Sequence, residues 1–266
     1  MKKTKLRDGT VIYCLRKPEA KMLDHHVEGY LQHGIEIHDN DIVFDIGANI
    51  GVFGVRVMQK AKNVSVYCLE PIPEILEVLS ANATLHGHGK MHVLPFGVSS
   101  ENTTATFTYF PNTPALSTLH PEQWDVDPRA FEKAVKGTMK SPPANMWWMR
   151  LIPRFFAGAI AKQLIKGKRT VNCELRTLSS LMEQENISKI DLLKIDCEGA
   201  EWEVLQGINE NDWAKINALV IEVHDTDDRV KKVQDLLLSK GFAKQHSEQE
   251  QGLESSQMFN IFALKS

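Results

Sequence analysis

Short apolar runs alternate with amphipathic segments along most of the chain, and this alternation is typical of a sheet covered by helices. The runs that we expect to form strands are residues 42–44, 64–69, 91–94, 190–195, 216–223, 241–245 and 258–264. Only a polar loop separates the last two runs, so we expect them to pair as an antiparallel hairpin. The pattern predicts one α/β domain with a seven-stranded, mostly parallel sheet and helices on both faces.

The chain has further segments outside this alternation. Residues 1–40 form an N-terminal cap segment, with a short strand around Thr10–Leu15 and a helical stretch from Pro18 to Gly34. Residues 103–110 alternate threonine with apolar or aromatic side chains, which predicts a strand in an added hairpin arm. Residues 111–170 then carry several prolines and many basic side chains. We expect this last stretch to be a lid or substrate insertion within a single domain that spans the whole chain.

A glycine-containing turn joins the first apolar run to the helix that follows it. Its residues are Asp45, Ile46, Gly47, Ala48, Asn49, Ile50 and Gly51. In α/β folds, ligands bind at this position, outside the carboxyl end of a strand. Gly47 and Gly51 let the backbone approach a ligand closely, and the first amides of the helix can bind a carboxylate or a phosphate. Glycine-rich turns also serve as plain connections.

An acid at the end of the second apolar run strengthens the case for a nucleotide ligand. Glu70 lies about 20 residues beyond the turn, where an acid can bind both hydroxyls of a ribose. The glycines do not follow the dinucleotide pattern G-x-G-x-x-G. The D-x-G-x-N-x-G form with an acid after the second strand resembles the first motif of class I S-adenosylmethionine methyltransferases. The alternative is a structural turn followed by a surface glutamate.

Two later stretches make the resemblance specific. Residues 193–201 read L-K-I-D-C-E-G-A-E, and residues 221–224 read I-E-V-H. Together with the glycine turn, and with D-G-T at residue 8 and Y-L-Q-H-G-I at residue 30, they resemble the FkbM family of methyltransferases, including members found in polyketide and mixed peptide assembly lines. The resemblance implies a class I methyltransferase (Rossmann-like) fold. It also implies transfer of a methyl group from S-adenosylmethionine to a hydroxyl oxygen.

The resemblance implies a set of cofactor contacts. Asp45 and Gly47 would contact the methionine portion, and Glu70 the ribose. Pro71 and Ile72 would cover one face of the adenine. The full set of residues expected to bind the cofactor is Asp45, Gly47, Ala48, Asn49, Gly51, Glu70, Pro71, Ile72, Gly97, Val98 and Asp196, with Gly97 and Val98 at the adenine edge.

Methylation of an alcohol calls for a positioned base, most often histidine, because an alcohol is a poor nucleophile. We expect His224 to be that base, with Glu222 or Glu198 holding its ring. Alternate residues of a strand share a face, so Glu222 and His224 point the same way. Asp196 would lie near the methyl group, and Lys194 would anchor a carboxylate or the acceptor oxygen. The alternatives are a structural ion pair for Lys194 and an ordinary, partnered histidine for His224.

The N-terminal segment contributes further histidines. His33 is a second candidate base, because the resemblance places residues 30–34 near the pocket. His25 and His26 fall on a polar helical stretch, and we expect them to face solvent.

The acids at these strand ends could also bind a metal ion. Some small-molecule O-methyltransferases hold Mg²⁺ with acids here, and Asp196, Glu198 and Glu222 could form such a carboxylate set. An ammonium group and an imidazole beside them fit a hard cation less well. We therefore expect no obligatory metal and no metal ligands.

Composition narrows the other possibilities. With 266 residues and 42% hydrophobic side chains, the chain can bury a sizeable core, and its net charge of −3 gives no general attraction to nucleic acid. The four cysteines are widely spaced, without a C-x-x-C pair, and we expect reduced thiols. No apolar run is long enough to span a bilayer, and the basic N-terminus lacks a following apolar segment. We expect a cytoplasmic protein.

The insertion is where we expect substrate choice to lie. Between Arg129 and Arg169, the cations Lys133, Lys136, Lys140, Arg150, Arg154, Lys162, Lys166 and Lys168 are opposed only by Glu132. Such a lid suits an acyl chain delivered on an acidic carrier protein. Two alternatives are a solvated cover with Trp147 and Trp148 packed on the core, and a segment (146–165) lying on a membrane surface.

The leading hypothesis is an S-adenosylmethionine-dependent O-methyltransferase acting on a natural-product intermediate, either a small molecule or one bound to an acyl carrier protein. Methylation of a sugar hydroxyl, and a cofactor-binding module without activity, are the alternatives.

Overall fold

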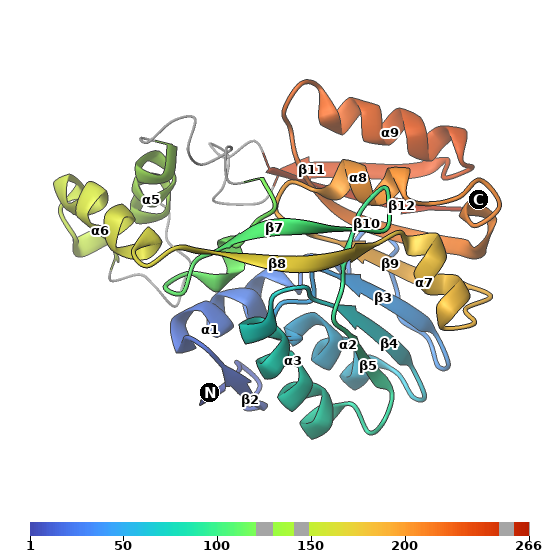
Figure 1. Cartoon of the computed structure of the whole chain (residues 1–266), viewed down its shortest axis with the longest axis horizontal. Coiled ribbons are helices and arrows are strands. Elements are labelled where there is room, and N and C mark those ends of the chain that lie inside the picture. The colour runs from blue at the N-terminus through green and yellow to red at the C-terminus, as the bar shows by residue number, and fades with distance from the viewer. Residues whose placement is uncertain (121–129, 141–148, 250–257, 266) are drawn as a thin grey trace.

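The computed structural model describes residues 1–120, 130–140, 149–249 and 258–265. Its main sheet has seven strands in the order β11-β12-β10-β9-β3-β4-β5 (Figure 1). The strands are β3 (Ile42–Ile46), β4 (Ser65–Leu69), β5 (Met91–Leu94), β9 (Ile190–Ile195), β10 (Ile216–His224), β11 (Lys244–Gln249) and β12 (Met258–Leu264). All neighbouring pairs are parallel except those of β12 with β10 and β11. The predicted sheet and its final hairpin are confirmed.

Helices cover both faces of this sheet. They are α1 (Lys17–His26), α2 (Val52–Lys60), α3 (Pro73–His86), α7 (Leu178–Gln184), α8 (Glu201–Gln206) and α9 (Arg229–Ser239). Successive strand residues point to opposite faces. Val43 therefore belongs to the core shared with α2 and α3, whereas its neighbour Phe44 belongs to the core shared with α7, α8 and α9.

Strand β11 begins at Lys244, later than the apolar run at residues 241–245 predicts. The start of that run forms the turn after α9 instead. Gly241 adopts φ +92° in this turn, and the amide of Phe242 donates to the carbonyl of Leu237 (3.0 Å). Phe242 is fully buried, so its hydrophobicity reflects packing in the core rather than strand pairing.

The N-terminal segment departs more from the pattern. Its lysine-rich start forms β1 (Lys2–Lys5), which pairs with β2 (Val11–Cys14). Helix α1 ends at His26, well before Gly34, where the sequence pattern predicts its end. Near the end of the helix, the fully buried carboxylate of Asp24 accepts hydrogen bonds from Arg56 Nε (2.9 Å) and from the Arg7 amide (2.9 Å).

The predicted strand at residues 103–110 is present in a second, smaller sheet, but its antiparallel partner lies beyond the insertion rather than in an adjacent hairpin. The strands of this sheet are β6 (Gly97–Val98), β7 (Thr103–Tyr109) and β8 (Arg169–Arg176), in the order β6-β8-β7. Strand β7 pairs with β8 in antiparallel fashion, and β8 pairs with β6 in parallel fashion. The sequence pattern did not predict β8, because polar side chains fill most of its positions.

The insertion between β7 and β8 contains η1 (Pro114–Leu116), α5 (Ala130–Lys140), η3 (Arg154–Phe156) and α6 (Ala157–Ile165). Figure 1 shows α5 and α6 together beyond one end of β7 and β8. They pack around their own small core of Val135, Met139, Met149, Ala157 and Ala161. Trp147 and Trp148 lie outside the described residues. In the described part of the chain, no helix is both long enough and apolar enough to cross a membrane.

Candidate active site

The carboxyl ends of β3 and β9 lie in direct backbone contact, and this contact defines the centre of the site. Gly47 has φ +73°, and a Cβ atom there would lie 1.7 Å from the carbonyl oxygen of Asp196. The amide of Asp196 in turn donates to the carbonyl of Ile46 (3.1 Å). Only glycine therefore lets the turn after β3 lie against the loop after β9.

Lys194 is the buried cation of this centre. Its Nζ lies 3.0 Å from Asp45 Oδ1 and 3.5 Å from Asp196 Oδ2, and it donates to the carbonyl of Gly47 (2.9 Å). Burial acts to lower the pKa of Lys194, but the two aspartates outweigh it and raise the pKa above its ordinary value. Burial raises the pKa of Asp45 despite this lysine, because the carboxyl group is completely enclosed. The structural ion pair, the alternative for Lys194, is thus observed, and the cofactor contact of Asp45 stays a prediction.

Asp196 is held in its charged form by several neighbours. Burial acts to raise its pKa, but Lys194, His26, Tyr30 and His224 together lower it below the ordinary value. An ionised carboxylate thus lies at the end of β9, where the sequence analysis expected the methyl group to be transferred.

Glu70 links the turns after β3 and β4. Its Oε2 accepts the amide of Asn49 (3.1 Å) and its Oε1 accepts the amide of Ile72 (3.0 Å). Asn49 adopts φ +49°, a left-handed conformation that asparagine tolerates better than most residues. Each carboxylate oxygen keeps a further lone pair for a hydroxyl. Burial raises the pKa of Glu70 to about 7.

The other expected cofactor residues lie around these two turns. A Cβ atom on Gly97 would lie 3.6 Å from Pro71 Cβ, so these two residues are neighbours, and their adenine contact stays a prediction. Val98 and Ile72 are buried. Gly51 caps α2 at φ +83°, and Ala48 donates its amide to the carbonyl of Leu69 (2.9 Å).

A second cluster lies at the ends of β9 and β10. Tyr30 Oη is 2.9 Å from Asp196 Oδ2, 3.2 Å from Glu222 Oε2 and 2.5 Å from His26 Nε2. His26 Nε2 also lies 2.9 Å from Glu222 Oε2. The expectation that His26 faces solvent is therefore wrong, whereas His25 is exposed. The end of α1 and the segment after it supply two groups to the site, and for His26 no sequence signal indicated this.

His224 lies beside this cluster, between two acids. Its Nε2 is 3.9 Å from Glu198 Oε2, and its Nδ1 is 3.9 Å from Glu201 Oε2. Burial acts to lower the pKa of His224, but Glu201, Glu198 and Glu222 raise it to about 10. Burial also raises the pKa of Glu198 well above its ordinary value. Among the described residues, neither ring nitrogen of His224 has a hydrogen-bond partner.

Glu201 is a site residue that the sequence analysis quoted without giving it a role. It is fully buried at the first position of α8, and its Oε1 accepts the amides of Gly199 (2.8 Å) and Cys197 (3.3 Å). An acid at the start of a helix is a common local feature, so nothing in the pattern separated it from an ordinary helix terminus. Its Oε2 is left facing the His224 ring.

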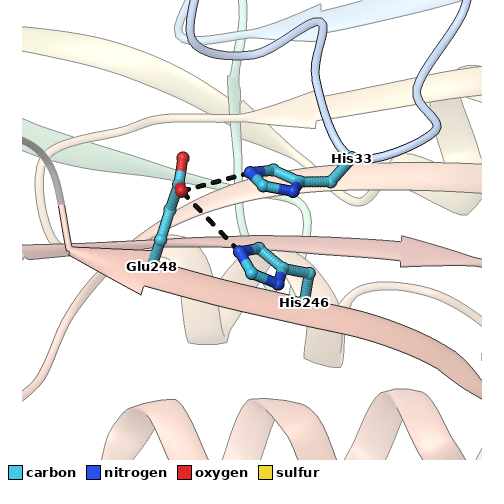
Figure 2. Close-up of side chains that lie close together, drawn as sticks. All are labelled: His33, His246 and Glu248. Atoms are coloured by element: carbon cyan, nitrogen blue, oxygen red, sulfur yellow. Dashed lines mark ion pairs between the residues drawn. The ribbon is translucent and has the colours of Figure 1, made fainter.

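His33 has its contacts elsewhere. Its Nε2 lies 3.1 Å from Glu248 Oε2, and its ring stacks on His246 with 3.7 Å between centroids (Figure 2). The structure does not bring it together with His224, and its role as a base stays a prediction without a contact to support it.

The structure brings together only two of the three acids that could form a carboxylate set for Mg²⁺. Ligand atoms of Asp196, Glu222 and His26 lie within 4.8 Å of one another, so His26 joins the set in place of Glu198. The hydroxyl of Tyr30 contacts all three, and Lys194 lies beside Asp196. The Tyr30 hydroxyl thus contacts both carboxylates, and the Lys194 ammonium lies beside that of Asp196.

The strand order, the antiparallel seventh strand, the glycine turn after β3 and the acid after β4 define a class I methyltransferase. The family model described as the methyltransferase FkbM domain matches residues 45–244. The chain belongs to this family, and it is a methyltransferase.

Three curated relatives illustrate the range of the family. The chain is 31% identical over 247 residues to methyltransferase sdnD of Sordaria araneosa, covering 88% of this chain and 86% of the relative. It is 30% identical over 241 residues to the 31-O-demethyl-FK506 methyltransferase FkbM of Streptomyces tacrolimicus, covering 90% and 87%. It is 24% identical over 189 residues to the hexuronic acid methyltransferase AglP of Haloferax volcanii, covering 71% and 58%.

A solved structure supports the fold. The methyltransferase FkbM from Methylobacillus flagellatus has a TM-score of 0.50 with 13% sequence identity, covering 92% of this chain and 52% of that chain. At this identity the likeness concerns the fold alone.

Proposed function

We propose that this methyltransferase transfers the methyl group of S-adenosylmethionine to a hydroxyl oxygen of a natural-product intermediate that is bound to a carrier protein. The main support comes from His224, which is buried and whose ring nitrogens have no hydrogen-bond partner among the described residues. An unpartnered buried imidazole is costly unless a ligand completes its hydrogen bonds. It lies at the same sheet edge as the glycine turn and Glu70.

The residues around the turn after β3 fit the proposed cofactor. Glu70 is held by two backbone amides and keeps acceptor capacity for two ribose hydroxyls. Gly97 and Pro71 are neighbours, so Pro71 can cover one face of an adenine while Gly97 lies at its edge. When bound, S-adenosylmethionine supplies an electrophilic methyl group on a sulfonium whose charge disappears on transfer. The chain's own task is then to orient the acceptor and to take its proton.

We assign the proton transfer to His224. The acceptor hydroxyl would donate to a ring nitrogen, and Glu198 and Glu201 would stabilise the imidazolium that forms. Because these acids raise the pKa of His224 to about 10, the ring must first lose a proton, so this assignment requires turnover to increase in alkaline solution. Tyr30 and Lys194 hold Asp196 in place to position the acceptor.

The surface of the insertion supports a carrier-bound acceptor. Leu151, Phe155 and Phe156 are large apolar side chains that are 72%, 78% and 47% exposed. The insertion also exposes the cations Lys136, Lys140, Arg150, Lys162, Lys166 and Lys168. An apolar surface bordered by cations suits an acyl chain delivered on an acidic protein.

A sugar hydroxyl is the second candidate acceptor, because a hexuronic acid methyltransferase is among the relatives. The chemistry at His224 would be the same for either acceptor, so the two differ in what the insertion must bind. A sugar acid would use the cations and leave the apolar side chains without a role.

Competition between acceptors tests this proposal. The chain is incubated with S-adenosylmethionine and with equal concentrations of a carrier-bound hydroxyacyl chain, the same chain without its hydroxyl, and a free hexuronic acid. We expect mass spectrometry to show one added methyl group on the hydroxyacyl chain only. Methylation of the uronic acid alone would select the second candidate. Binding of the cofactor without methylation of any acceptor would contradict both.

A further inference from the structure

A group of three metal-ligand side chains lies away from the active site, on the side of the sheet's edge strand. His246 and Glu248 are alternate residues of β11, so they share one face of that strand. His33 reaches the same place from the segment that follows α1. Figure 2 shows the two imidazole rings stacked one above the other, with the carboxylate of Glu248 facing both.

The three ligand atoms converge on one point. Glu248 Oε2 lies 3.1 Å from His33 Nε2 and 3.6 Å from His246 Nε2. All three atoms lie within 4.8 Å of one another. Two atoms that bind one tetrahedral zinc ion at about 2.1 Å are roughly 3.4 Å apart, and the two nitrogen–oxygen separations bracket that value.

The two rings contact each other and the core beside them. The two imidazoles stack at 3.7 Å with 21° between their planes, and His33 also lies 4.7 Å from the buried ring of Phe262. His33 adopts φ +51°, which is uncommon for a residue other than glycine. The side chains of His33, His246 and Glu248 are 29%, 48% and 38% exposed, so a water molecule could take a fourth ligand position.

We propose that His33, His246 and Glu248 form a binding site for a transition-metal ion of the zinc type. Two neutral imidazoles and one carboxylate suit Zn²⁺, Ni²⁺ and Cu²⁺ better than Mg²⁺, which prefers oxygen ligands alone. Stacked as they are, the rings must rotate by a modest amount to aim both lone pairs at one ion, and their exposure allows this.

The site would connect distant parts of the chain. His33 follows Tyr30 by three residues, and Tyr30 contacts Asp196 and Glu222 in the active site. A metal ion bound by His33 and by β11 therefore fixes the segment that carries Tyr30 to the edge of the sheet. Since the ion binds the folded chain, it raises the thermal midpoint, by roughly 5–10 °C at a hundredfold excess over its dissociation constant.

Metal titration of the untagged full chain tests the site. After removal of metal with EDTA and exchange of the buffer, Zn²⁺ is titrated by calorimetry and Co²⁺ by its visible absorption. We expect one Zn²⁺ per chain, a tetrahedral Co²⁺ spectrum, and at least a tenfold loss of affinity in His246→Ala and in Glu248→Gln. Ser247→Ala, from the same strand, serves as the matched control and should bind as the unmodified chain does.

A further variant separates this site from the active-site cluster. His26→Ala removes the only histidine of the Asp196–Glu222 group described above. Unchanged Zn²⁺ binding in His26→Ala, with loss in His246→Ala, supports the proposal. Loss in His26→Ala with retention in His246→Ala overturns it, as does the absence of Zn²⁺ binding in the unmodified chain up to millimolar concentration.

Discussion

Replacing Glu70 by glutamine tests the cofactor site most sharply, because it keeps the shape of the side chain and removes its charge. Both carboxylate oxygens accept backbone amides, from Asn49 and Ile72. The amide group of glutamine has one oxygen and one NH₂, so it must turn a donor toward one of these two amides. One ribose hydroxyl then loses its acceptor, and the other loses a charged one.

The expected size of the effect follows from these contacts. A hydrogen bond to a charged group is worth about 1.5–3 kcal/mol, so losing one and weakening another costs binding about 2–3 kcal/mol. This corresponds to a roughly 30- to 150-fold weaker affinity for S-adenosylmethionine. Separately, the backbone amide left without an acceptor lowers the free energy of unfolding by about 1–3 kcal/mol.

Calorimetric titration measures the affinity, and urea unfolding measures the stability. Glu77→Gln is the matched control, because Glu77 is exposed on α3 and should leave both quantities unchanged. An affinity of Glu70→Gln equal to that of the unmodified chain would refute the ribose contact, provided that the variant is folded at the temperature of the titration.

The remaining predictions concern pH and three other positions. Because Glu70 has a pKa of about 7 in the folded chain, its carboxylate gains charge as the pH rises through 7, and titrations between pH 6 and 8 should show tighter cofactor binding at the higher pH. Since His224 has a pKa of about 10, it is cationic at neutral pH; kcat should increase with pH toward 10, and His224→Gln should lower kcat roughly a hundredfold or more and abolish that increase. The charged ring also contributes stability that is fully present below its ordinary pKa of about 6.5 and is lost as the pH rises through 10, which urea unfolding at several pH values would reveal. Tyr30→Phe removes the hydroxyl between Asp196 and Glu222, so steady-state kinetics should show kcat reduced by roughly 10- to 150-fold with unchanged cofactor affinity; a normal kcat would make the cluster structural. Gly47→Ala should cost more than about 3 kcal/mol of unfolding free energy, because its Cβ would overlap Asp196, whereas Gly9→Ala, also at positive φ but with open space, should cost only about 1 kcal/mol.

Most of the main sheet could be predicted from the sequence because its central strands are buried on both faces. Runs such as Ile190–Ile195 are apolar at most positions, and this pattern depends on no distant contact. Strand β8 lies in the small outer sheet with polar side chains at most positions, so its sequence resembles that of a loop. Near the early end of α1, Asp24 is buried against Arg56, a contact that only the folded chain creates.

Some residues of the candidate site could likewise be predicted from the sequence, and others could not. Glu70 and Gly47 could be predicted as candidate site residues from their positions at strand ends, and the structure places them in the turns after β4 and β3. His26 could not be predicted, because its helix is polar and its partner Glu222 lies at the far end of the sequence. Glu201 resembles any acid at a helix start until the fold places His224 beside it.

A crystal structure of the chain with S-adenosylhomocysteine would show directly where the cofactor lies. We expect both ribose hydroxyls on the Glu70 carboxylate, the adenine with Pro71 against one face and Gly97 at its edge, and the sulfur facing the side of Asp196 and His224. A product bound elsewhere, or with its ribose away from Glu70, would contradict this expectation.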